Sequence, residues 1–187
     1  VESITVDPGE AVAQVMLVAA ADAPIAGKLG QLVGKLDDPA QPALLVGGRT
    51  QQDVVMVRGQ NNTPFFTEQI PSLAVGVTTA APFSVQIVEP KAPLVQNGVM
   101  KLKVVATRAE GFTAPIKIDL LQNPPGVNSS REISIPEGQT EAFIDINAAG
   151  NAAVKESKIA VRADATVGNG IVRTASSFVN LKVAEPY

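Results

Sequence analysis

The stretch Lys101-Leu102-Lys103-Val104-Val105-Ala106 decides the fold, because its apolar residues recur at every second position. In an extended chain Leu102, Val104 and Ala106 share one face, and the two lysines occupy the other. The same alternation returns in short runs at residues 116–120, 133–135, 142–147, 159–164 and 179–183. Such runs are typical of antiparallel strands with one buried face, so the sequence predicts an all-β fold.

Turn signals separate these runs. Asn123-Pro124-Pro125-Gly126 cannot continue a strand, because proline lacks an N–H group and glycine accepts positive φ. Pro136-Glu137-Gly138 and Gly168-Asn169-Gly170 are typical of hairpin connections. Short strands with turns at a spacing of roughly 8–12 residues predict a sandwich or a barrel.

An internal repeat bears on the alanine-rich stretch from Ala11 to Ala23, for which helix propensity alone favours a helix. Residues Ile4 to Ile25 align without gaps with residues Ile133 to Val154, which lie in the alternating region. A second block also matches, with a shifted offset: Arg49-Thr50 and Val54–Arg58 correspond to Arg173-Thr174 and Phe178–Lys182. We therefore predict that residues 11–23 form a strand that runs into a short loop.

The second copy of the repeat lies inside a longer unit that starts near Phe83, and the first copy lacks the upstream half of that unit. Residues 1–58 are therefore expected to be the C-terminal half of a domain, followed by a loop and linker at about 59–82. Half a domain leaves open sheet edges. The candidates for covering them are the segment Leu73–Val77, the neighbouring module or another chain.

The composition excludes several classes of function. The 187 residues contain no cysteine, histidine or tryptophan, and Tyr187 is the one tyrosine. Disulfides, zinc–thiolate sites, His-ligated metals and a Ser-His-Asp triad are therefore excluded within the chain. The lack of Trp and Tyr also argues against an aromatic platform for sugars or single-stranded bases.

The charge and the hydropathy of the sequence argue against two further classes of protein, those that bind nucleic acid and those with a membrane-spanning helix. The net charge of −3 without a basic cluster argues against nucleic-acid binding. No apolar run reaches the ~18–20 residues that a membrane-spanning helix needs. The sequence begins at Val1 rather than at a methionine, so we expect a processed chain or a fragment.

Four residue pairs are candidates for a site. Asp37-Asp38 could bind a hard cation such as calcium, but no Asp-x-Asp-x-Asp-Gly pattern surrounds it and a solvated turn is favoured. Phe65-Phe66 could anchor a ligand, but a plug at a core edge or domain junction is favoured. Ser129-Ser130 and Ser176-Ser177 are interpreted as turn or edge residues, because no histidine and no Gly-x-Ser-x-Gly motif accompanies them.

The remaining charged residues receive structural interpretations. Arg49 and Arg173 occupy equivalent repeat positions and are expected to pair with acidic neighbours. Asp145, Glu156 and Asp164 are expected on outward faces, where they serve solubility alone. No catalytic, cofactor-binding or metal-binding residue is assigned, and no cofactor is expected.

Three motifs follow one another in the second half of the chain. They are Thr107-Arg108-Ala109-Glu110-Gly111-Phe112-Thr113-Ala114-Pro115-Ile116, then Pro124-Pro125-Gly126-Val127, then Ile133-Ser134-Ile135-Pro136-Glu137-Gly138-Gln139 with the Ala148–Ala152 loop. From about Phe83 to its end the chain resembles the immunoglobulin-like (Ig-like) modules repeated in large secreted or surface proteins of bacteria. It lacks the cysteine pair, buried tryptophan and tyrosine corner of antibody domains.

The resemblance implies tandem Ig-like β-sandwich modules, with a partial module plus linker at 1–82 and a complete module at 83–187. It implies a non-catalytic spacer or adhesive role in a larger extracytoplasmic bacterial protein, secreted or at the cell surface. The alternatives are a surface-layer or filament subunit that assembles by strand exchange, and a substrate-binding accessory domain of a secreted hydrolase. The expected partners are other modules or protein chains, including further copies of this chain through the incomplete first module.

Overall fold

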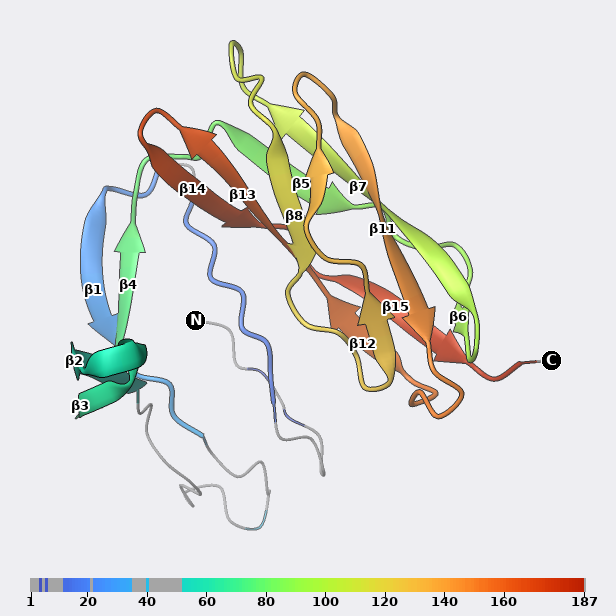
Figure 1. Cartoon of the computed structure of the whole chain (residues 1–187), viewed down its shortest axis with the longest axis horizontal. Helices are drawn as coiled ribbons and strands as arrows, with labels where there is room; N and C mark the ends of the chain where they lie inside the picture. The colour runs from blue at the N-terminus through green and yellow to red at the C-terminus, as the bar shows by residue number, and fades with distance from the viewer. Residues whose placement is uncertain are drawn as a thin grey trace. The chain divides into compact units, whose positions relative to one another are not determined.

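The computed structural model describes residues 4, 6, 12–20, 22–34, 40 and 52–186. The chain divides into two compact units, Val1–Thr79 (unit 1) and Ala80–Tyr187 (unit 2). The described residues form fifteen β-strands, one short 3-10 turn and no α-helix (Figure 1). The prediction of an all-β fold is therefore confirmed.

Unit 2 contains two four-stranded sheets and one three-stranded sheet. The first sheet has the order β5 (Phe83–Ile87), β7 (Val99–Arg108), β11 (Glu141–Ala148), β9 (Val127–Ser129). The second has the order β10 (Ile133–Ile135), β8 (Ile116–Leu120), β13 (Val161–Val167), β14 (Gly170–Ala175). The third has the order β12 (Glu156–Ile159), β15 (Val179–Ala184), β6 (Leu94–Val95), in which β15 and β6 are parallel.

One apolar core joins the sheets of unit 2. Leu102, Val104 and Ala106, the face predicted from the alternation in β7, are all buried. They belong to one cluster with side chains from the other sheets, including Ile116, Ile118, Ile144, Ile146, Val161, Ala163, Leu181 and Val183. Each large aliphatic side chain buried in this way contributes about 1.5–3 kcal/mol, so alternation on facing sheets is what holds this sandwich-like arrangement together.

Two connections change sheets at one point of unit 2. The chain leaves β12 at Ile159, passes through buried Ala160 and continues in a different sheet as β13 from Val161. The connection from β14 to β15 makes a second change of sheet through Ser176. The Ser176 N–H donates to the Val161 carbonyl at 2.9 Å, and the Val161 N–H donates to Ser176 Oγ at 3.0 Å. These two hydrogen bonds join the two crossings.

The chain enters and leaves unit 2 at opposite ends (Figure 1). On entering, Phe83 pairs with Arg108, the last residue of β7. On leaving, the Ala184 carbonyl accepts a hydrogen bond from the Gln96 N–H at 2.9 Å, close in sequence to the first residue of β7, Val99. Ten residues of β7 lie between these ends, which corresponds to about 30 Å at ~3.3 Å per residue.

Unit 1 contains two two-stranded ribbons. β1 (Ala26–Gly30) pairs antiparallel with β4 (Leu73–Val77). β2 (Gln52–Arg58) pairs antiparallel with β3 (Pro64–Ile70) through the 3-10 turn η1 (Gln60–Asn62). Asn61 and Asn62 have φ values of 56° and 61°. Asparagine tolerates this left-handed conformation better than most residues, so the chain reverses within a few residues.

The structure corrects three predictions for unit 1. The stretch 59–82 is not a continuous loop and linker, because β3 and β4 form within it, each against a partner strand. No strand forms at residues 12–20, although the absence of a helix there agrees with the repeat. A strand needs a neighbouring ladder, and none of the described strands pairs with this segment. Finally, Val54–Arg58 pairs with β3, whereas the matched Phe178–Lys182 region pairs through β15 with β12 and β6.

Candidate functional site

The side chain of Arg108 joins the first and third sequence motifs by hydrogen bonds, and we call this set of contacts the Arg108 clamp. The Arg108 guanidinium donates to three backbone carbonyls, those of Ala114 at 2.6 Å, Gln139 at 2.8 Å and Pro136 at 3.1 Å. These acceptors come from two loops that are far apart in sequence. Because guanidinium presents several donors in a fixed plane, one side chain at the end of β7 can hold both loops.

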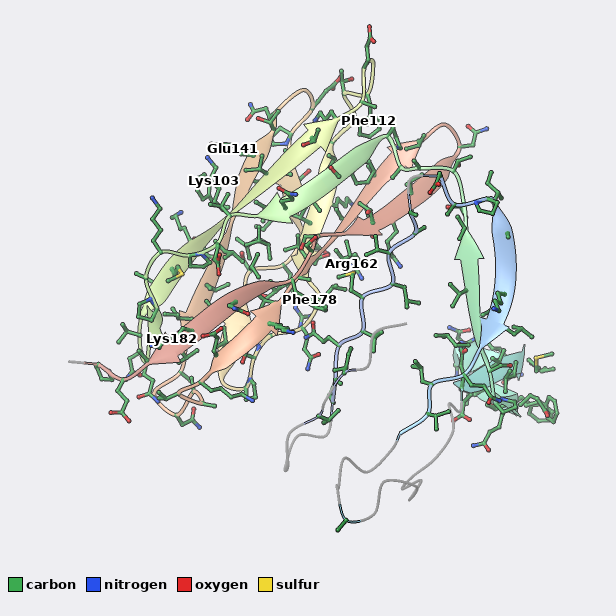
Figure 2. The ribbon with its side chains drawn as sticks, turned by 180° about the vertical axis from the view of Figure 1, so that it is seen from behind. Lys103, Phe112, Glu141, Arg162, Phe178 and Lys182 are labelled. Atoms are coloured by element: carbon green, nitrogen blue, oxygen red, sulfur yellow. The ribbon has the colours of Figure 1, made fainter. Side chains whose placement is uncertain are left out.

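An aromatic contact supports the Arg108 clamp. Arg108 lies over the Phe112 ring, with its guanidinium carbon 5.6 Å from the ring centroid. Phe112 in turn stacks on Phe83, the first residue of β5, with centroids 5.4 Å apart. Figure 2 shows Phe112 at this end of the unit. The clamp therefore fixes the place where the chain enters unit 2.

A second clamp joins the Pro124–Val127 turn to the Ala148–Ala152 loop. The Ala149 N–H donates to the Gly126 carbonyl at 2.8 Å. Gly126 has φ 76°, and a Cβ atom at this position would lie 2.6 Å from the Ala152 Cα atom. The glycine is therefore required both for the backbone conformation and for the close approach of the loop. The sequence motifs that carry the family resemblance thus supply contacts between the loops of unit 2.

A row of charges crosses the sheet from β8 to β14. Arg162 Nη2 lies 2.9 Å from Asp119 Oδ2, and Arg162 Nε lies 3.6 Å from Asp164 Oδ2. Arg173 donates to both oxygens of Asp164, at 2.7 and 2.8 Å. The hydrogen bond from Arg173 is the main cause that lowers the pKa of Asp164, and the charges of Arg173, Arg162 and Lys117 act in the same direction.

This row confirms one expectation and corrects another. Arg173 pairs with an acidic neighbour, as predicted. Asp164 was expected to serve solubility alone, but its side chain is 18% exposed and binds two arginines. The partners come from the antiparallel register of β13 and β14, in which Asp164 faces Arg173. That register depends on the hairpin between them and is not visible from single residues.

Both serine pairs are engaged in structural hydrogen bonds. Ser129 Oγ donates to Asn123 Oδ1 at 2.9 Å, and Ser130 Oγ accepts from the Asp145 N–H at 3.0 Å. Ser176 Oγ accepts from Val161 and donates to the Ser177 carbonyl at 2.9 Å. Among the described residues Ser176 is the one buried polar residue. These contacts support the interpretation of turn and edge residues.

The outward face of the β7–β11 pair carries ion pairs. Lys103 Nζ contacts Glu141, and Figure 2 shows the two side chains next to each other on neighbouring strands. Lys101 Nζ lies 3.4 Å from Asp145 Oδ1, which places Asp145 outward as expected. Such exposed pairs contribute little, about 0–1 kcal/mol each.

The most exposed aromatic side chains of the described chain belong to unit 1. Phe65 is 81% exposed and Phe66 is 52% exposed, so neither fills a core edge of unit 1, and the place at a domain junction stays a prediction. They lie on the β2–β3 ribbon, with which no other strand of the described residues pairs. Asp37-Asp38 and Arg49 lie outside the described residues.

No group of three or more metal-ligating side chains gathers in the part of the chain that the structure describes. The same part holds no helix with the length and hydrophobicity needed to cross a bilayer. An open depression lies over β1 and β4, lined by Gly27, Lys28, Leu29, Ala74, Val75 and Gly76.

No protein-family model and no curated protein matches this chain. Among solved structures, the chain is similar to domains 4 and 5 of the S-layer protein SbsC. The sequence identity is 15% and the TM-score is 0.33, and the match covers 65% of this chain and 68% of the other.

Proposed function

We propose that unit 2 is an Ig-like module that acts as a non-catalytic spacer in a larger extracytoplasmic bacterial protein, and that unit 1 belongs to a neighbouring module of the same kind. The observation that carries the proposal is the position of the two ends of unit 2. The chain enters at Phe83, beside the end of β7, and leaves after Ala184, beside its start. A module with ends about 30 Å apart lengthens a tandem array by that amount.

The hydrogen bonds of unit 2 suit a spacer, because they fix both ends of the unit and the two connections that change sheets between these ends. The Arg108 clamp holds the loops at the end where the chain enters. At the other end, β15 pairs in parallel with β6, so the departing chain is fixed to the body of the unit. The hydrogen bonds of Ser176 join the two sheet changes between these ends. A spacer needs a fixed distance between its ends, and these contacts supply it.

The family resemblance supports the same proposal. The motif residues Arg108, Phe112 and Gly126 all serve loop contacts within the unit. Motifs of this kind hold the shape of the module. The surface location follows from the resemblance and belongs to the proposal.

An exchange of modules tests the spacer role. In the parent protein, residues 83–187 are replaced by an unrelated β-sandwich whose ends also lie about 30 Å apart, and in a matched control by a short flexible linker. We expect the unrelated sandwich to preserve surface display and activity of the parent protein, and the linker to impair them. Loss of function with both replacements would show that the surface of unit 2 itself binds a partner or substrate.

A further inference from the structure

We propose that Asn169, at the turn between β13 and β14, is a site of spontaneous deamidation in the folded chain, and that the tertiary structure protects Asn97 from the same reaction. Asparagine followed by glycine is the sequence that favours this reaction most, because glycine leaves the attacking backbone nitrogen uncrowded. The chain contains two such sequences, Asn97-Gly98 and Asn169-Gly170. This inference is independent of the spacer role, because it concerns the backbone chemistry of unit 2 itself.

The reaction takes place within the chain, and its one co-reactant is water. The backbone nitrogen of Gly170 attacks Cγ of the Asn169 side chain. A bond forms between these two atoms, the bond from Cγ to the amide nitrogen breaks, and that nitrogen leaves as ammonia with the Gly170 proton. Water then opens the five-membered succinimide at either of its carbonyl groups, which gives aspartate or isoaspartate at position 169. The reaction therefore requires a side chain that can turn onto the next backbone nitrogen.

Asn169 lies in an exposed turn of two residues. Gly168 has φ 59°, and Val167 and Gly170 form the last pair of the β13–β14 ladder. Residues 168–171 are all exposed, and the Asn169 side chain makes no hydrogen bond or ion pair with any residue that the structure describes. A ladder opens most readily at its end, so the Gly170 nitrogen can be released there. Both the side chain and the nitrogen that the reaction needs are thus accessible.

The Asn97 side chain is held against a neighbouring loop. It lies so close to Gly150 that a Cβ atom at that position would be 2.9 Å from Oδ1 and 3.1 Å from Nδ2 of Asn97. The backbone of the next residue is also held in place. The Gly98 N–H donates to the Val95 carbonyl at 2.8 Å, and the Gly98 carbonyl accepts from the Ala148 N–H at 3.1 Å. The side chain and the nitrogen of this second sequence are therefore both restrained.

The residue before Asn97 adds two further hydrogen bonds to this turn between β6 and β7. The Gln96 N–H donates to the Ala184 carbonyl at 2.9 Å, and Gln96 Nε2 donates to the Ala152 carbonyl at 2.8 Å. Opening the turn therefore breaks several bonds at once. Each net hydrogen bond lowers the population of an open state by roughly two- to tenfold. The two asparagines are both exposed, so it is these contacts that distinguish them.

The product changes the end of a hairpin and leaves the core of unit 2 in place. Either product adds a negative charge at the turn, and isoaspartate also lengthens the backbone of the turn by one atom. The same hairpin sets Asp164 opposite Arg173 three pairs from the turn. Because residues 168–171 are exposed, the folded unit can accumulate the modification without opening its core.

Peptide mapping by mass spectrometry tests the proposal on the full chain, incubated at mildly alkaline pH with samples taken over time. The same incubation in concentrated urea is the reference, because both sequences are then free of the fold. Gly170→Ala places a methyl group beside the attacking nitrogen, and its Cβ would meet no atom within 4 Å beyond its chain neighbours. Gly150→Ala is the matched variant for the second site, because its Cβ displaces the flexible Asn97 amide.

We expect Asn169 to convert at least about tenfold faster than Asn97 in the folded chain, because several hydrogen bonds restrain Asn97, and the two rates to be similar in urea. Gly170→Ala should slow conversion at position 169 alone, and Gly150→Ala should speed conversion at position 97 alone, several-fold in each case. A variant that unfolds is recognised by faster conversion at the other site.

Equal rates at the two sites of the folded chain, or the same ratio of rates with and without urea, would overturn the proposal. An unchanged rate at Asn97 in Gly150→Ala would overturn the protection assigned to its contact with Gly150. None of these rates depends on the outcome of the module exchange.

Discussion

Replacing Ser176 by alanine should destabilise unit 2, because the hydroxyl is the acceptor for a buried backbone group. Ser176 is 1% exposed and Val161 is 0% exposed, and the Val161 N–H donates to Ser176 Oγ at 3.0 Å. Water cannot replace the lost acceptor at this depth. A buried N–H group without an acceptor costs about 1–3 kcal/mol, so we expect the free energy of unfolding to fall by about that amount.

The assay is urea unfolding of the full chain followed by far-ultraviolet circular dichroism, with a thermal scan alongside. For a unit of about 100 residues, 1 kcal/mol corresponds to roughly 4–8 °C in Tm, so the expected decrease is at least several degrees. Hydrogen exchange should speed up first in β12–β13 and in β14–β15, where the two crossings meet.

Ser177→Ala is the matched control, because Ser177 is exposed and contributes its carbonyl rather than its side chain to the Ser176 contact. We expect it to change the free energy of unfolding by less than about 0.5 kcal/mol. If Ser176→Ala were as mild as Ser177→Ala, the hydroxyl would not hold the crossing, and the argument for a joined pair of sheet changes would be refuted.

Three further predictions concern the clamps and the charge row of unit 2. Gly126→Ala should destabilise the unit by about 1–3 kcal/mol in urea unfolding, more than Gly111→Ala, because both glycines have positive φ but only Gly126 approaches Ala152. Arg108→Lys should cost about 1–2 kcal/mol in the same assay, since an ammonium group cannot reach three carbonyls at once, and an unchanged midpoint would contradict the clamp. The lowered pKa of Asp164 means that its contribution is present above the unfolded carboxyl pKa of about 3.9 and is lost as the pH falls through the folded pKa. Thermal scans from neutral to acid pH should therefore show a higher Tm for the wild type than for Asp164→Asn at neutral pH, and the two Tm values should converge as the pH falls below that unfolded pKa. A difference in Tm that stays constant would refute this assignment.

The sequence by itself determined the class of the fold and the buried face of the strands in unit 2. Alternation is a local property, and a period of two places Leu102, Val104 and Ala106 on one face whatever the neighbouring strand is. The turns were visible for the same reason, because proline and glycine act through their own backbone. Composition alone excluded histidine and cysteine chemistry.

Tertiary structure decided everything that depends on which strands become neighbours. Val54–Arg58 reads as a strand, but only the reversal at Asn61 and Asn62 makes β3 its partner. Asp164 looked like a solubilising residue until the register of β13 and β14 placed Arg173 opposite it. Val15 and Leu17 have the alternation of a strand, yet the described residues 12–20 form none. The physical reason is the same in each case, because the backbone hydrogen bonds and the burial of a strand are supplied by other strands. A sequence pattern therefore shows that a segment can form a strand, and the tertiary structure decides whether a partner strand lies beside it.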